Sequence, residues 1–204
     1  LLTQLKKLDN NIEIIIVNDG STDKTKSILE NQTLFKVIHN PKNMGKGFSI
    51  ISGAKEAKNN NIILMDGDLE IDLTCVKDLI EKFELMNDHV ILGNRWTADN
   101  KNNTNINTYG NYLFNLIFNF LFNTNINDVL CCAKIIEKNL FQSLNLNSKG
   151  FSIEAEIMSK IALIKPKFSE VKVDYKRRFN HQGKKLKISD GWDILWRMLK
   201  IRIG

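Results

Sequence analysis

The sequence predicts a single α/β domain built on a mostly parallel sheet with helices on both faces. Short apolar runs rich in Ile and Val alternate with longer amphipathic segments, as strands do when crossover helices join them. Polar stretches that contain glycine follow several of these runs, which is typical of loops at the ends of buried strands. The chain has 204 residues, and 43% of them are apolar, which is enough for one domain with a proper core.

The composition limits the partners and the compartment. A net charge of +6, with the excess weighted toward the C-terminal third, indicates an anionic partner such as phosphate groups or a membrane surface. The lysines are dispersed and no nucleic-acid-binding motif is present, so we expect no nucleic acid partner. The three cysteines fit neither a disulfide framework nor a zinc site, which indicates a reducing compartment. No apolar run reaches the roughly 20 residues that span a bilayer, and the first residues show no signal-peptide pattern.

Helices and strands alternate through the first half of the chain. The β-branched run over 12–17 predicts a strand buried on both faces, and four consecutive apolar residues predict another over 62–65. Leucines at positions 1, 2, 5 and 8 predict an amphipathic helix. In order, the predicted elements are a helix over 1–9, a strand over 12–17, a helix ending at 29, a strand over 34–39, a helix over 48–58, a strand over 62–65, a helix over 73–86 and a strand over 90–93.

The second half is less regular. Residues 97–107 are polar and rich in asparagine. The helix predicted over 109–122 is apolar on more than one flank, so it either packs on two sides or touches lipid, and core packing is the favoured explanation. The remaining predicted elements are a short buried strand over 128–134, a helix that opens at 150–156, a strand over 171–175 and an amphipathic helix over 189–203.

The polar turn after the first predicted strand offers candidate binding residues. Asp19 and Asp23 would stand at the C-terminal edge of the sheet, which is where open α/β sheets bind ligands. Gly20 permits a tight turn, and Ser21 or Thr22 is expected to cap the following helix. Turn formation and helix capping also explain these residues, and the spacing alone favours that explanation.

A cluster of acids follows the strand over 62–65. Asp66 and Asp68 flank Gly67, and Glu70 comes two residues later. Two carboxylates about 4 Å apart repel each other by about 4 kcal/mol at an effective dielectric of 20. A hard divalent cation such as Mg²⁺ or Mn²⁺ would relieve this repulsion. A solvated acidic turn before a helix capped by Asp72 explains the pattern equally well.

Two basic loops are candidates for anion binding. Gly45, Lys46 and Gly47 precede the helix over 48–58, where free N–H groups and the helix dipole suit an anion, although the spacing matches neither a P-loop nor a dinucleotide fingerprint. Residues 177–187 are strongly basic around Gly183 and form either a solvated surface or a phosphate-binding loop. The basic side chains of this second loop are Arg177, Arg178, His181, Lys184, Lys185 and Lys187.

Tryptophans stand beside basic residues in the last predicted helix. Trp192 and Trp196 are accompanied by Arg197, Lys200 and Arg202. This combination fits the headgroup region of an anionic membrane, and it fits a helix that docks on its own domain nearly as well.

Seven motifs follow one another along the chain: NDGSTD, NMGKG, DGDLE, GNR, DVLCCAK, GFSIEAE and YKRRFNHQGKK. This series resembles the inverting family 2 glycosyltransferases of the GT-A fold, and more narrowly the dolichyl- or polyprenyl-phosphate sugar synthases of the dolichyl-phosphate mannose synthase type. The resemblance covers nearly all of the chain and implies one domain over 1–204, with a nucleotide-sugar half over 1–95 and an acceptor half over 96–204. These enzymes begin with a strand ending in a P-x-Y-N-E-like turn, which this sequence lacks, so the resemblance also implies an N-terminal truncation.

The resemblance implies a donor site that contains Asp19 and the acidic cluster. Asp19 would contact the nucleotide base or ribose, and Asp66 with Asp68 would form the diphosphate and metal motif. Glu70 stands where many relatives have a glutamine that binds the metal, and a glutamate coordinates Mg²⁺ or Mn²⁺ as well. The implied nucleotide-sugar-binding residues are Asp19, Gly20, Asp23, Gly45, Lys46 and Asp66, and the implied metal ligands are Asp66, Asp68 and Glu70.

On the acceptor side, Arg95 resembles the arginine after the fourth strand that reaches the donor or acceptor phosphate. Arg178 with Lys184 or Lys185 resembles the region that grips phosphate, although Lys184 and Lys185 replace the usual Ser-Lys pair after a longer spacer. Asp128 is expected to line the acceptor side without acting as a base. The implied catalytic residues are Asp66, Asp68, Arg95 and Arg178.

The resemblance implies transfer of a hexose, with inversion, from a nucleotide sugar of the GDP-mannose or UDP-glucose type to polyprenyl or dolichyl phosphate. The protein would work at the cytoplasmic face of a membrane as a peripheral enzyme. A phosphate monoester has its second pKa near 6, so this acceptor needs positioning more than deprotonation. Two alternatives remain: transfer to a glycan or protein hydroxyl, which needs a base, and a truncated nucleotide-binding domain without turnover.

Overall fold

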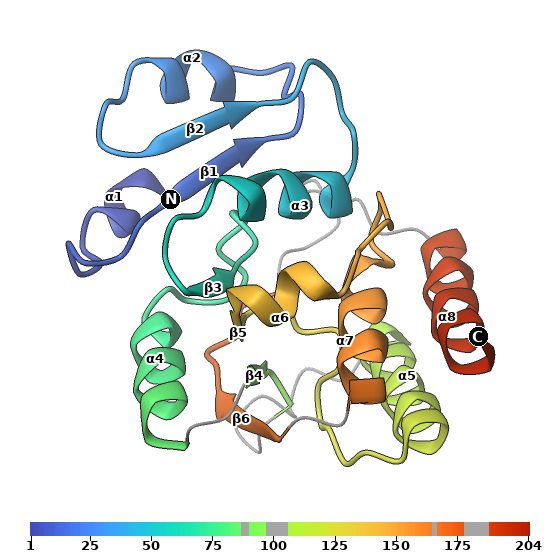
Figure 1. Ribbon diagram of the computed structural model, residues 1–204. Helices are drawn as coiled ribbons and strands as arrows, with labels where there is room; N and C mark the ends of the chain where they lie inside the picture. Colours follow the sequence, from blue (N-terminus) through green and yellow to red (C-terminus); the bar gives the residue numbers. More distant parts are fainter. Residues whose placement is uncertain (87–89, 97–105, 165–166, 178–187) are drawn as a thin grey trace.

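Two sheets form the framework of the computed structural model, which describes residues 1–86, 90–96, 106–164, 167–177 and 188–204 (Figure 1). β1 (Ile15–Asn18) and β2 (Lys36–His39) pair in parallel as the first sheet. The second sheet has the order β3-β5-β4-β6, and its strands are β3 (Asn61–Leu64), β5 (Lys134–Glu137), β4 (Val90–Asn94) and β6 (Phe168–Lys172). The α/β class is therefore confirmed, but the parallel character is partial, because β5 runs antiparallel to both β3 and β4.

The strand predicted over 128–134 was misplaced. The chain turns through these residues, and β5 begins only at Lys134. A lysine normally ends a buried strand, but Lys134 is fully buried and the apolar run continues through Ile135 and Ile136. α6 (Lys138–Ser143), which was not predicted, follows β5 directly.

Each of the other predicted helices is present, but its ends differ from the predicted ones. α1 stops at Leu5 rather than at Asp9, and α2 begins at Thr25 after Lys24, so neither Ser21 nor Thr22 caps it. Asp72 does accept a hydrogen bond from Thr74 N at 3.0 Å just before α4. The helices are α1 (Leu2–Leu5), α2 (Thr25–Glu30), α3 (Lys46–Glu56), α4 (Cys75–Met86), α5 (Ile106–Phe122), α7 (Ile153–Ile164) and α8 (Ile188–Ile203). Among the helices described, none is long and apolar enough to cross a bilayer.

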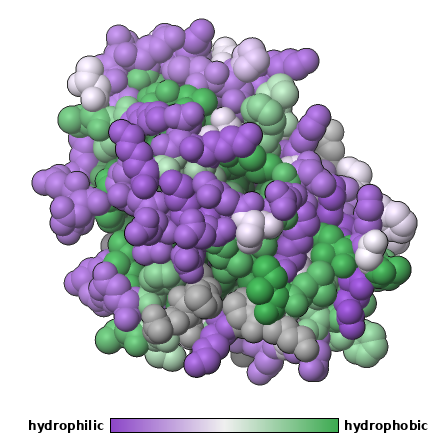
Figure 2. Space-filling view, viewed as in Figure 1, coloured by the Kyte–Doolittle hydropathy of each residue, from purple (hydrophilic) through white to green (hydrophobic). Residues whose placement is uncertain are grey.

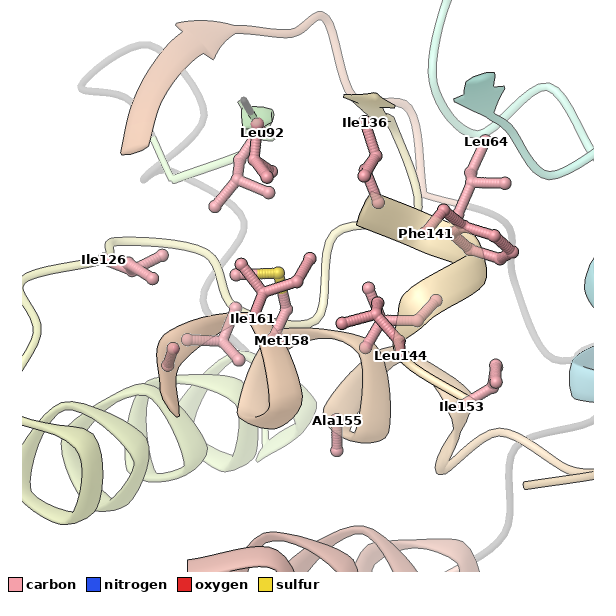
Figure 3. Packing of buried hydrophobic residues seen from close by; sticks show 14 of the residues in the cluster. Leu64, Leu92, Ile126, Ile136, Phe141, Leu144, Ile153, Ala155, Met158 and Ile161 are labelled. Atoms are coloured by element: carbon pink, nitrogen blue, oxygen red, sulfur yellow. The ribbon is translucent and has the colours of Figure 1, made fainter. Parts of the chain in front are cut away.

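The four-stranded sheet has a hydrophobic cluster on each face. Leu92 and Ile136 pack with α6, α7 and the buried flank of α5 on one face (Figure 3). Ile91 and Ile135, their neighbours along the strands, pack against α4 on the other face, because successive strand residues point to opposite sides. Helices therefore cover both faces of this sheet, as predicted.

α5 packs on the core with one flank only. Phe118 and Phe122 are buried, whereas Tyr112, Leu116 and Phe120 are exposed. The favoured expectation of core packing on two sides is thus wrong for the second flank. α8 runs beside α5, with Gly191 near Phe114.

A gap separates the two sheets. In the part of the chain that the structure describes, no strand pairs with the edge of β1 or of β3 that faces this gap. Residues 11–17 and 59–65 from these two edges line one cavity of about 1540 Å³. The gap explains why β1 is half-buried over most of its length, which corrects the prediction of a strand buried on both faces.

Candidate active site

The acidic turn lies at the C-terminal end of β3, as the sequence predicted, and the backbone of a distant segment holds it. Glu70 O accepts a hydrogen bond from Lys176 N at 2.7 Å, and Asp174 O accepts one from Asp72 N at 3.1 Å. Leu69, just before the first of these anchors, has a φ of +59°, a conformation that L residues rarely adopt. The turn is therefore fixed beside residues 174–176, which directly precede the basic sequence over 177–187.

Lys46 brings a positive charge to this turn. Its Nζ lies 2.8 Å from both carboxylate oxygens of Asp66 and 2.9 Å from Oε1 of Glu154. Burial alone would lower the pKa of Lys46, but Glu154 and Asp66 together raise it well above its ordinary value. The repulsion expected between Asp66 and its neighbouring acids is thus relieved by a lysine.

Asp19 organises the loop that carries Lys46. Its carboxylate accepts hydrogen bonds from Met44 N at 2.8 Å, Gly45 N at 2.9 Å and Asn40 Nδ2 at 2.8 Å. Burial would raise the pKa of Asp19, but these hydrogen bonds outweigh it and hold the pKa below its ordinary value. Asp19 therefore shapes the start of α3, a role that the sequence did not indicate.

The backbone at the start of α3 is partly used within the protein. The N–H groups of Gly47 and Phe48 both donate to Lys149 O, at 2.7 and 3.3 Å, so these two donors do not match the expectation of free N–H groups for an anion. The approach is close: a Cβ on Gly47 would lie 2.0 Å from Ser148 O, and one on Gly45, whose φ is +94°, would lie 2.3 Å from Lys149 O. Glycine is required at both positions.

Arg95 is held in one orientation at the end of β4. Its Nε and Nη2 donate to the two carboxylate oxygens of Asp128 at 2.7 and 2.8 Å. The guanidinium lies 5.1 Å from the ring centroid of Trp96 and 5.4 Å from that of Tyr175. Asp128 is only 1% exposed, so it can affect an acceptor only through Arg95.

The site contains two charged residues that sequence reasoning missed. Lys134 from β5 and Glu154 from α7 are both buried and form an ion pair behind Lys46. Burial would raise the pKa of Glu154, but the ammonium groups of Lys134 and Lys46 lower it to about 2. The sequence did contain a sign of this pair, because Lys134 and Glu154 each stand inside an apolar run. A charged residue that is buried in such a run needs a partner of opposite charge. Glu156 points elsewhere and pairs with Lys160, because residues two apart on a helix face different directions.

Most of the predicted site residues that the structure describes meet at the cavity between the sheets, but three of them do not line it. Gly20 has a φ of +67° and forms a turn against the backbone of Lys42. Asp23 accepts a hydrogen bond from Thr25 N, and Asp128 is covered by Arg95. Arg178, Lys184 and Lys185 lie outside the described residues. The predicted residues that line the cavity are Asp19, Gly45, Lys46, Asp66, Asp68, Glu70 and Arg95.

The carboxylates of the turn can hold a divalent cation with help from a substrate. Among the described residues, no three His, Cys, Asp or Glu side chains form a metal-binding cluster. The third acid of the turn, Glu70, accepts a hydrogen bond from the hydroxyl group of Tyr175. Burial and the neighbouring Glu70 carboxylate raise the pKa of Tyr175 to about 12. Mg²⁺ commonly uses one or two carboxylates and completes its shell with substrate phosphates and water. Asp66 and Asp68 fit that donor set.

The mixed α/β fold, with an acidic turn after an edge strand of the four-stranded sheet, places this chain in the class of GT-A glycosyltransferase folds. Glucosyl-3-phosphoglycerate synthase from Mycobacterium tuberculosis, solved with Mn²⁺, UDP and phosphoglyceric acid, matches with a TM-score of 0.70 at 13% identity, over 93% of this chain and 67% of the other. TarS of S. aureus, solved with UDP-GlcNAc, matches with a TM-score of 0.64 at 19% identity, over 98% of this chain and 61% of the other.

Within this class, the chain belongs to glycosyl transferase family 2, whose family model matches residues 1–144. Dolichyl-phosphate beta-glucosyltransferase ALG5A of Trichomonas vaginalis is 25% identical over 202 residues, which cover 94% of this chain and 61% of the relative. Dolichol-phosphate mannosyltransferase of Pyrococcus furiosus is 28% identical over 172 residues, which cover 79% of this chain and 46% of the relative. The chain thus spans about half to two thirds of the length of these relatives.

Proposed function

We propose that this chain transfers a hexose from a nucleotide sugar to a polyprenyl or dolichyl phosphate, with inversion at the sugar and with the help of Mg²⁺ or Mn²⁺. The observation that carries the proposal is that one cavity is lined by Asp66, Asp68, Arg95 and Arg177. The departing diphosphate and the acceptor phosphate thereby both have charged groups of the protein within the same space. The names of the two dolichyl-phosphate relatives support the choice of acceptor.

On the donor side, the chain supplies the loop held by Asp19 and the turn that contains Asp66 and Asp68. The loop and the turn meet through the contact between Lys46 and Asp66. A divalent cation, when bound, would neutralise the charge of the departing nucleoside diphosphate. The protein's own part is to hold these groups in fixed positions before the reaction.

On the acceptor side, Arg95 has a fixed direction because Asp128 holds it from behind. A lipid phosphate is largely a dianion at neutral pH, so it attacks without a protein base. Arg95, together with Arg178, Lys184 and Lys185, would place that dianion on the side of the sugar opposite to the leaving group. Asp128 is poorly placed as a base for a hydroxyl acceptor, because its carboxylate is buried and bonded to Arg95.

The surface of α5 and α8 supports a membrane location for this reaction. Arg202 Nε donates to Leu121 O at 2.6 Å, and Gly191 lies near Phe114, so the two helices run side by side in the same direction. Figure 2 shows hydrophobic residues in green among hydrophilic ones in purple over this part of the molecule. Several of these residues are exposed and recur every three, four or seven positions, as in a stripe along each helix. They are Tyr109, Tyr112, Leu113, Leu116 and Phe120 on α5, and Trp192, Trp196 and Ile203 on α8.

We expect this stripe to bind anionic membranes at the cytoplasmic face as a peripheral surface. Replacing Phe120 by alanine, or Trp196 by alanine, should weaken binding to vesicles containing phosphatidylserine by roughly tenfold, since burying one large apolar side chain contributes about 1.5–3 kcal/mol. Leu85→Ala is the matched control, because Leu85 is 80% exposed on α4, away from the stripe. Vesicle sedimentation measures the effect, and equal losses in all three variants would contradict this orientation.

The proposed reaction is tested with labelled UDP- and GDP-sugars, Mn²⁺ and polyprenyl phosphate. Label that enters the organic phase only when polyprenyl phosphate is present would support the proposal and identify the donor. The unphosphorylated polyprenol is the matched control for the acceptor. Transfer to polyprenol, or to a glycan hydroxyl, at the same rate would contradict the phosphate acceptor, and no transfer from any donor would contradict the enzymatic activity of this chain.

A further inference from the structure

Four charged side chains of alternating sign form a continuous chain from the core to the cavity. Lys134 pairs with Oε2 of Glu154, Oε1 of Glu154 lies 2.9 Å from Lys46 Nζ, and this Nζ lies 2.8 Å from Asp66. The exposed fraction of the side chains rises along this series from 0% at Lys134 to 6%, 16% and 35% at Asp66. We refer to these four residues as the charge chain.

The charge chain joins the two halves that the sequence suggested. Lys134 and Glu154 lie on β5 and α7 of the C-terminal half, whereas Lys46 and Asp66 lie on α3 and after β3 in the N-terminal half. Buried ion pairs stabilise a fold no better than apolar residues of the same volume. Four charges aligned toward a binding cavity therefore call for an explanation other than stability.

The geometry at Asp66 provides that explanation. Both oxygens of this carboxylate lie at 2.8 Å from an ammonium group, so Lys46 takes the place that a cation would otherwise take. Lys46 is held beside it, because Glu154 also binds the ammonium and Lys134 binds Glu154 in turn. A divalent cation that approached Asp66 would also meet the repulsion of this positive charge.

We propose that Lys46, positioned by Glu154 and Lys134, is an internal cation that keeps Asp66 from binding a divalent metal ion before the nucleotide arrives. The diphosphate then supplies the negative charge that draws the metal ion to the turn beside Asp68. Metal binding thereby depends on the nucleotide. This inference rests on the proposed donor site and assigns an order of binding to it.

The test measures binding of Mn²⁺ alone, from the electron paramagnetic resonance signal of the free ion. The wild-type chain should bind Mn²⁺ weakly, and UDP or GDP should strengthen this binding. In Lys46→Met, Mn²⁺ alone should bind about tenfold more tightly, because a repelling charge close to a carboxylate has been removed. The gain from the nucleotide should shrink accordingly.

Lys42→Met is the matched control, because Lys42 lies on the same loop, is exposed and carries the same charge. It should bind Mn²⁺ as the wild type does. Unchanged or weaker binding of Mn²⁺ by Lys46→Met would overturn the inference while leaving the donor site intact. A wild-type chain that binds no Mn²⁺ even with UDP or GDP would instead contradict the donor site of the proposed function.

Folding is checked by circular dichroism and thermal melting of each variant. If Lys46→Met does not fold, Lys46→Gln replaces it, since glutamine keeps donors for a carboxylate without the charge. If both fail to fold while Lys46→Arg folds, the positive charge serves the structure and the inference is overturned.

Discussion

Replacement of Asp68 by alanine is expected to reduce sugar transfer by about 100-fold or more, since a divalent cation at this turn would supply several kcal/mol to the departure of the nucleoside diphosphate. Asp68 lines the cavity two residues after Asp66, and its Oδ1 accepts a hydrogen bond from Glu70 N at 3.0 Å. Because Lys46 already neutralises Asp66, the second carboxylate of the turn should carry most of the interaction with the metal ion.

The measurement is kcat with saturating donor, together with the melting temperature. Asp78→Ala is the matched control, because Asp78 is exposed on α4 and its loss changes the net charge equally. Asp68→Ala should melt within a few degrees of the wild type. A variant with more than about a tenth of the wild-type kcat would contradict a metal role for Asp68.

Replacement of Glu154 by glutamine is expected to lower the free energy of unfolding by about 3–5 kcal/mol, which is the usual cost of leaving a buried charge without its partner. The charge at stake is the ammonium group of Lys134, which is fully buried. Urea denaturation measures the effect. The double variant Lys134→Met with Glu154→Gln removes both charges and should recover most of the lost stability.

The surface pair Lys36–Glu56 is the matched control, since its side chains are 40% and 51% exposed. Neutralising Glu56 should leave the free energy of unfolding nearly unchanged, because a solvent-exposed ion pair contributes little. A double variant at 134 and 154 that is as unstable as Glu154→Gln alone would show that lost packing, rather than an unpaired charge, causes the effect.

Acid should destabilise the protein through the same residue. The pKa of Glu154 is about 2 in the folded chain, below the ordinary value of 4.5. A carboxylate with a lowered pKa contributes stability that is fully present above the unfolded value and is lost as the pH falls through the folded value. This contribution is about 3 kcal/mol by linkage. The stability of the wild type should therefore fall between pH 5 and pH 2 more than that of the double variant.

The acidic turn and Arg95 were predictable from sequence because local rules decide their place. Carboxylates cannot continue a buried strand, so Asp66 and Asp68 had to stand at its end. The same reasoning placed Arg95 after β4. The tight turn at Gly20 also followed from local geometry, and this glycine adopts a positive φ.

The charge chain was not predictable in the same way, because its members are far apart in sequence. Lys134 was taken as the end of a strand, since its partner Glu154 lies 20 residues away and its burial depends on that partner. The antiparallel direction of β5 likewise depends on how the chain returns between β3 and β4, which no residue pattern encodes. Core packing was favoured over an exposed flank for α5 because apolar periodicity alone does not tell a core face from a surface that touches lipid.

The gap between the two sheets has a consequence for the dynamics of the chain. The first 45 residues contribute only Leu5, Asn18, Leu29 and Asn40 as buried residues, and neither hydrophobic cluster includes any of them. A segment with so few buried contacts opens locally at a lower free energy than the core sheet does. Its amide hydrogens should exchange with solvent sooner than those of β4 and β5. A nucleotide that bridges Asp19 and the acidic turn would then close a loosely held lobe onto a rigid one, and part of its binding free energy would be used in ordering that lobe.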